Sequence, residues 1–151
     1  MSFIDHKQYP FPYLILVLAA LKTFIIASTT LKQLANFIAT YHSVKQMLWI
    51  FGLLISLSIF SFATDYTCLY LFDGQHFEGI ISSSRTYIAN LYHFTYFSLT
   101  TFSTLGFGDI APISSFSRFL VMLEIFLSFF IVVFAFTNIQ KIHLDEKGQN
   151  N

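Results

Sequence analysis

The chain has 151 residues, of which 55% are hydrophobic and only 11% are charged, and its formal net charge is zero. An average soluble domain carries about 25% charged residues, so this composition excludes intrinsic disorder, a nucleic-acid-binding domain and an ordinary cytosolic enzyme. The single cysteine, Cys68, excludes an intrachain disulfide and a cysteine-rich metal site. An integral membrane protein is the class that remains.

The first apolar stretch runs from Phe11 to Ser28 and is slightly shorter than the about 20 residues that cross a bilayer. It contains Lys22, and a lysine at the centre of a span costs about 3 kcal/mol unless its ammonium group reaches an interface. The many Leu and Ile side chains can offset this cost, so we predict a third span here. The alternative is a helix that lies in the plane of the interface.

Two further stretches reach spanning length. The segment from Trp49 to Ala63, with its flanks, contains no charge between Lys45 and Asp65. The segment from Phe119 to Ile139 contains Glu124 as its one charge. Both are predicted to be membrane-spanning helices.

The placement of basic residues predicts the orientation of these helices. Residues 29–47 carry two lysines and no acid, whereas residues 65–85 carry three acids and one basic residue. The first segment is therefore predicted to be cytoplasmic and the second external. If residues 11–28 also span, the N-terminus lies outside and Lys22 sits toward the cytoplasmic side, which puts it in the opposite half of the membrane from Glu124. The alternative is that Lys22 faces Glu124.

The segment between the two longer spans, residues 86–108, contains no Asp, Glu, Lys or Arg. It is rich in Ser and Thr between positions 95 and 104, and Gly106 and Gly108 follow. A helix from about Ile88 to Ser103 that enters the membrane, followed by a non-helical return to the same side, fits this composition. Non-helical backbone at membrane depth must be buried in protein or line a watery cavity, so the segment predicts a pore made by several chains.

The run Thr104-Leu105-Gly106-Phe107-Gly108-Asp109, here called the filter segment, resembles the selectivity filter of potassium channels, whose common form is Thr-Val-Gly-Tyr-Gly-Asp. The residues from Tyr96 to Thr101 look like the helix that precedes this filter in the family. The resemblance covers residues 44–140. Three further positions fall where the family often has Pro, Thr or Ser, and Arg: Pro112, Ser114 and Arg118.

The resemblance implies an all-α membrane protein with an outer helix, a re-entrant pore helix and filter loop, and an inner helix, assembled as a tetrameric pore. We therefore divide the chain into an N-terminal hydrophobic helix and connector (1–43), the pore domain (44–140) and a short cytoplasmic tail (141–151). The family's ion sites would be formed by the backbone carbonyls of Thr104, Leu105, Gly106 and Phe107, with Gly108 completing the strand and Asp109 placing charge near the outer mouth.

The inner helix has no glycine between Arg118 and Gln140, and Ser128 stands where relatives often bend at one. An apolar cavity with a dewetting gate near Phe129 to Phe136 is one hypothesis, and packing of these phenylalanines between helices is the equal alternative. Helical spacing from Arg118 predicts the pore-lining face as Ile125, Phe129, Val132, Phe136 and Gln140.

Glu124 and three aromatic residues near the filter carry further predictions. Glu124 is expected to be neutral and hydrogen-bonded to a hydroxyl of the pore helix, or alternatively to bind a cation or sense protons. Phe107 replaces the family's commoner Tyr, and with Tyr96 and Phe97 in place of tryptophans it predicts a softer support around the filter.

The resemblance implies a multi-pass channel of the plasma (inner) membrane that conducts K⁺ passively. It implies no catalytic activity and no cofactor other than the permeant ion. The expected partners are copies of the same chain, the lipid bilayer and K⁺, with no nucleic acid. A weakly selective cation channel and a non-conducting regulatory subunit of another channel are the two alternatives.

Overall fold

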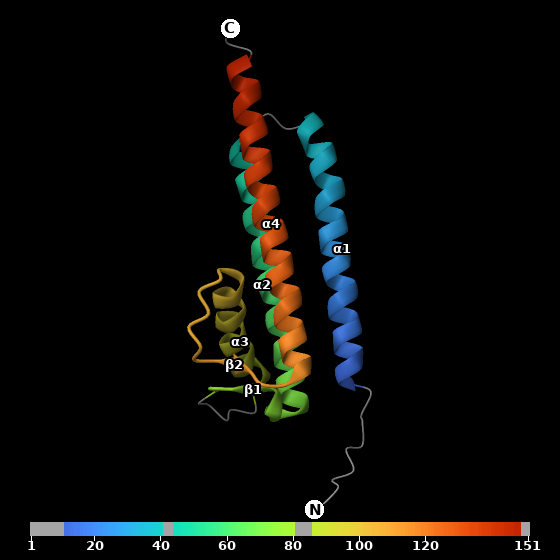
Figure 1. The fold of residues 1–151 in the computed structure, drawn as a ribbon, viewed down its shortest axis with the longest axis vertical. Helices are drawn as coiled ribbons and strands as arrows, with labels where there is room; N and C mark the ends of the chain where they lie inside the picture. The colour runs from blue at the N-terminus through green and yellow to red at the C-terminus, as the bar shows by residue number, and fades with distance from the viewer. Residues whose placement is uncertain (1–10, 41–43, 81–85, 149–151) are drawn as a thin grey trace, which may run out of the picture.

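The computed structural model describes residues 11–40, 44–80 and 86–148, with side chains for 13–29, 45, 48–80 and 86–136. Four helices dominate the described chain. Helix α2 (Val44–Phe72) and helix α4 (Ser115–Gly148) run antiparallel along the long axis, and α1 (Phe11–Thr40) lies beside them (Figure 1). This helical architecture confirms the predicted all-α fold.

The regions Leu48–Phe72 and Ser115–Phe136 are long and apolar enough to cross a membrane. They correspond to the two spans predicted around Trp49–Ala63 and Phe119–Ile139. Among the α1 residues whose side chains are described, Tyr13–Thr29 form an apolar stretch, and the helix itself continues to Thr40.

Helix α3 (Tyr87–Phe102) is short and packs at one end of the α2–α4 pair (Figure 1). Its bounds lie within one residue of the predicted helix. After α3, the chain returns through the non-helical filter segment. It comes back to the end of the molecule where α3 begins, and α4 starts there (Figure 1). The predicted re-entrant path is thus present.

An aromatic cluster between α2 and α3 forms the centre of the core. Tyr66 is fully buried, and its ring lies 5.2 Å from Phe97, 5.6 Å from Phe77 and 6.1 Å from Phe94 between centroids. Such ring pairs contribute about 0.5–1.5 kcal/mol each beyond the area they bury. The cluster therefore fixes α3 firmly against α2.

Two small elements join the helices, a single turn η1 (Gly74–His76) and an antiparallel pair of two-residue strands. Strand β1 (Phe77–Glu78) pairs with β2 (Ala111–Pro112), with Phe77 opposite Pro112. This pair connects the segment after α2 with the residues that follow the filter segment. Elements this short have no periodicity by which the sequence could have predicted them.

Candidate functional site

The filter segment has an alternating backbone. Thr104, Gly106 and Gly108 have φ angles of 60°, 51° and 78°, which lie in the left-handed region. Glycine adopts this region at little cost, but for the β-branched Thr104 it is a strained conformation that costs on the order of 1–3 kcal/mol. Strain of this kind persists where the surrounding structure fixes the backbone, and it is frequent at functional sites.

In the filter segment, backbone amides donate hydrogen bonds within the chain, whereas the backbone carbonyls of residues 104–107 accept none from a backbone amide of the described residues. The amides of Leu105 and Gly106 donate to the carbonyl oxygen of Thr100, at N···O distances of 2.9 and 3.3 Å, and the Thr104 amide donates to the Thr101 carbonyl at 3.0 Å. These bonds satisfy carbonyls at the C-terminus of α3 that have no partner within the helix. Within the described chain, no backbone amide donates to the carbonyls of residues 104–107, so those oxygens are available to a ligand.

Tyr96 of α3 supports the filter segment from behind. Its ring is stacked on Phe107, with the centroids 6.4 Å apart and the planes at 8°. Phe97 does not reach the filter, because it is buried in the aromatic cluster of Tyr66. One of the two residues in place of the family's tryptophans therefore contacts the filter segment directly.

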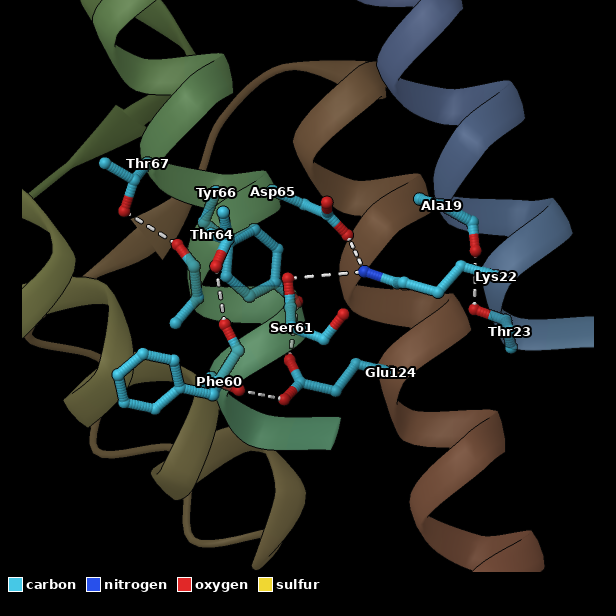
Figure 2. Close-up of polar contacts among 12 residues, drawn as sticks. Ala19, Lys22, Thr23, Phe60, Ser61, Thr64, Asp65, Tyr66, Thr67 and Glu124 are labelled. Carbon is cyan, nitrogen blue, oxygen red and sulfur yellow. Dashed lines mark hydrogen bonds and ion pairs between the residues drawn. The ribbon is translucent and has the colours of Figure 1, made fainter. Parts of the chain in front are cut away.

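Glu124 forms a three-helix contact, here called the carboxyl node, with Tyr66 of α2 (Figure 2) and with Ser98 of α3. The Tyr66 hydroxyl donates to Glu124 Oε2 at 2.6 Å, and Ser98 Oγ is hydrogen-bonded to Glu124 Oε1. The Glu124 side chain is only 1% exposed. The predicted bond to a pore-helix hydroxyl is present, whereas Tyr66, 58 residues away in the chain, was not predicted as a partner.

Lys22 lies beside this node, as the alternative prediction held, whereas its placement in the opposite half by the charge-based orientation was wrong. Its ammonium group forms an ion pair with Asp65, contacts the Ser61 carbonyl at 3.3 Å and lies 4.6 Å from the centre of the Phe62 ring (Figure 2). Asp65 is also not in an external loop, because α2 continues to Phe72. Lys22 is the twelfth residue of α1, a helix of 30 residues, and therefore sits in its first half.

The outer end of the filter segment is held by the segment after α2. Gly79 has φ +90°, and a Cβ placed there would lie 1.7 Å from the carbonyl oxygen of Asp109. Only glycine permits this approach. Together with the β1–β2 pair, this contact joins the Phe77–Gly79 segment to the exit of the filter segment.

His76 forms a second contact in the same region that the sequence did not reveal. Its Nδ1 lies 2.7 Å from Ser114 Oγ, and its carbonyl oxygen accepts from the Ile113 amide at 3.0 Å and the Ser117 hydroxyl at 2.8 Å. Ser114 also accepts from the Ser117 amide and so caps the start of α4. The imidazole thus joins η1 to Ser114, the residue that caps α4.

Protonation of His76 is expected to weaken this outer contact. Burial lowers the pKa of the imidazole from its ordinary value of 6.5, and the nearby Asp73 opposes part of that shift. The unfolded chain therefore binds a proton more readily than the folded chain between the lowered pKa and 6.5. The contribution of His76 to the free energy of unfolding is complete above pH 6.5 and declines as the pH falls below it. Thermal unfolding of wild type and His76→Gln should show a steeper decline below that pH for wild type, and equal slopes would contradict this assignment.

The predicted pore-lining residues share one exposed face of α4. Four of them are exposed by 36%, 61%, 39% and 68% in the chain, in the order Ile125, Phe129, Val132 and Phe136. Gln140 lies in the part of α4 whose side chains are outside the described residues. Ser128 is 2% exposed, faces the core and donates to the Ile125 carbonyl at 2.8 Å within a helix that continues to Gly148.

Comparison with known proteins gives the family. A family model described as "Ion channel" matches residues 13–144. The chain belongs to this ion channel family. The chain is also 31% identical over 123 residues to a protein of Plasmodium berghei named "Potassium channel K2". The match covers 81% of this chain and 8% of that relative, so the chain corresponds to a small part of the longer protein. No solved structure matches.

The family assignment and the two long apolar helices support a membrane protein, and the family argues against an enzyme. The family match begins at residue 13, so it includes most of α1 as well as the region of the predicted pore domain.

Proposed function

We propose that the chain assembles as a homotetramer whose four filter segments enclose a potassium-selective pore, and that this pore conducts K⁺ passively across the plasma membrane. The carbonyl oxygens of Thr104, Leu105, Gly106 and Phe107, with the Thr104 hydroxyl, would replace the water around the ion. The relative named as a potassium channel supports the choice of ion.

The main support for this proposal is that the amides of the filter segment are hydrogen-bonded, while its carbonyls accept no hydrogen bond from the described chain. Its amides donate back to the end of α3, and its carbonyls accept nothing from the described chain. The alternating left-handed angles at residues 104, 106 and 108 allow successive carbonyls to face the same way. A row of carbonyls is the ligand set that potassium filters present to a dehydrated ion.

The exposure of the filter segment favours assembly. Leu105 is 62% exposed and Phe107 is 65% exposed in the single chain. Irregular backbone at membrane depth is tolerated only inside protein or along a watery cavity, and one chain does not cover this segment. Four copies around an axis would cover the outward side of the filter and leave its carbonyls facing the pore.

The exposed face of α4 would then border the inner cavity. Phe129 and Phe136 are the large exposed side chains along this face. Rings of such residues can close a pore by excluding water from it. The same side chains could instead pack between neighbouring subunits, and small substitutions at both positions would separate the two roles, because only loss of a gate raises basal flux.

The orientation of α1 yields a separate prediction. Helix α1 runs antiparallel to α2, so its first residue lies at the end of the molecule where the filter segment exits (Figure 1). If α1 spans the membrane, Ser2→Cys and Glu78→Cys, each made in a Cys68→Ala background, should be labelled by an impermeant thiol reagent from the same side. Labelling of Ser2→Cys from the opposite side would contradict a third span.

Reconstitution into liposomes tests the proposal as a whole. The purified protein should cross-link as a tetramer and release K⁺, with the flux blocked by barium. Equal release of K⁺ and Na⁺ would favour the weakly selective cation channel. A stable tetramer without flux, even when Phe129 and Phe136 are both replaced by alanine, would favour the non-conducting subunit.

A further inference from the structure

The carboxyl node places a glutamate in an apolar, fully enclosed position. Glu124 is 1% exposed, and its partners Tyr66 and Ser98 are both 0% exposed. Figure 2 shows the Glu124 carboxyl group facing α2 and lying near the Lys22–Asp65 ion pair. An ionised carboxylate in such a position is costly unless a cation and hydrogen bonds compensate it. The protonation state of Glu124 therefore depends on the hydrogen bonds and charges around it.

The hydrogen atoms available at the node give the first argument. Ser98 Oγ contacts two acceptors, Glu124 Oε1 and the carbonyl oxygen of Ile59, the latter at 3.0 Å. A serine hydroxyl has one hydrogen, and an ionised carboxylate has none to give. If Ser98 donates to Ile59, the bond to Glu124 Oε1 requires a hydrogen on that oxygen. Both bonds form together only when Glu124 is a carboxylic acid that donates to Ser98.

The charges around the node give an independent argument. The groups that face Glu124 are Lys22 from α1, Asp65 and Tyr66 from α2, and the uncharged hydroxyl of Ser98 from α3. The one cation, Lys22, is in direct contact with Asp65. With Asp65 and Glu124 both ionised, the cluster would carry a net charge of minus one, whereas a protonated Glu124 makes it neutral. A neutral cluster is the less costly one in an apolar interior.

We propose that Glu124 is a proton-binding site, in which the bound proton completes a hydrogen-bonded chain from Glu124 of α4 through Ser98 of α3 to the Ile59 carbonyl of α2. Removal of this proton forces Ser98 to turn its one hydrogen to the carboxylate, and the bond to Ile59 is lost. Ser98 precedes the filter segment by only six residues along α3 and its C-terminal turn. The proton therefore holds the pore helix to both neighbouring helices.

Infrared difference spectroscopy on the full-length protein in lipid at neutral pH tests the proton directly. The wild-type spectrum minus that of Glu124→Gln should contain the C=O stretching band of a protonated carboxyl group. The matched variant Lys22→Met, Asp65→Asn removes both charges of the ion pair, so its difference spectrum should contain carboxylate bands only. A difference spectrum for Glu124→Gln that contains carboxylate bands alone would overturn the proposal.

A second variant keeps the test valid if the Gln protein folds poorly. Ser98→Ala retains Glu124 but removes the acceptor of its proton, so the same carboxylic C=O band should remain and shift in frequency. Absence of the band in wild type, or a band unchanged by Ser98→Ala, would contradict the proposed chain of bonds. Because the spectrum reports protonation whether or not the protein conducts, failure of this proposal is separable from failure of the proposed channel function.

Discussion

Replacement of Gly106 by alanine is expected to abolish potassium flux while the protein still folds and assembles. Gly106 has φ +51°, and a Cβ there would meet no atom of the chain within 4 Å. The cost is therefore conformational, about 1–2 kcal/mol for an L-residue in the left-handed region, and it would recur in each subunit of a tetramer. The filter backbone would relax away from the alternating conformation, and its carbonyls would no longer face the ion together. Flux from K⁺-loaded liposomes measures the loss.

Gly52→Ala provides the matched control for this substitution. Gly52 lies inside α2, its φ is outside the left-handed region, and a Cβ there would also meet no atom within 4 Å. Alanine is more favourable than glycine in a helix interior by about 1 kcal/mol, so this variant should retain flux and be at least as stable as wild type. Normal flux in Gly106→Ala would show that the filter conformation described here is not needed for conduction.

The Lys22–Asp65 ion pair is expected to be the contact on which the docking of α1 depends most. Removal of one partner of a buried pair costs about 3–5 kcal/mol because the other charge is left uncompensated. The two side chains are 25% and 21% exposed in the chain, so the lower end, about 3 kcal/mol, is expected for Lys22→Met. Thermal unfolding in detergent measures this loss.

A double-mutant cycle separates the ion pair from simple packing. The double variant Lys22→Met, Asp65→Leu removes both charges and should recover most of the lost stability, since apolar residues of similar volume often replace a buried pair without cost. Lys45→Met, at an exposed position near the start of α2, should change stability by less than about 0.5 kcal/mol. Additive effects of the two single substitutions would mean that the pair contributes no specific interaction.

Much of the fold could be predicted because its signals are local in the sequence. The apolar runs around Trp49–Ala63 and Phe119–Ile139 define α2 and α4, and the Ser/Thr-rich stretch followed by two glycines defines α3 and the return loop. The hydrogen bond predicted between Glu124 and a hydroxyl of α3 is present, since a lone acid in an apolar helix needs a polar partner and α3 supplies many hydroxyl groups.

The contacts that the sequence did not reveal all join distant segments. Lys22 was misplaced because the orientation argument treated residues 11–28 as the whole span, whereas α1 continues to Thr40 and brings the lysine level with Asp65. Tyr66 and His76 have no local feature that indicates their partners on α4. The approach of Gly79 to Asp109 depends on a left-handed glycine, which is visible only once the two segments are seen together.

The reversal potential of the current through the purified protein in a planar bilayer tests the central proposal most directly. With K⁺ on one side and Na⁺ on the other, the proposed carbonyl filter predicts a current that reverses close to the K⁺ equilibrium potential. A current that reverses near zero would show that the filter segment does not discriminate between the two ions, and would contradict the account of a potassium-selective pore.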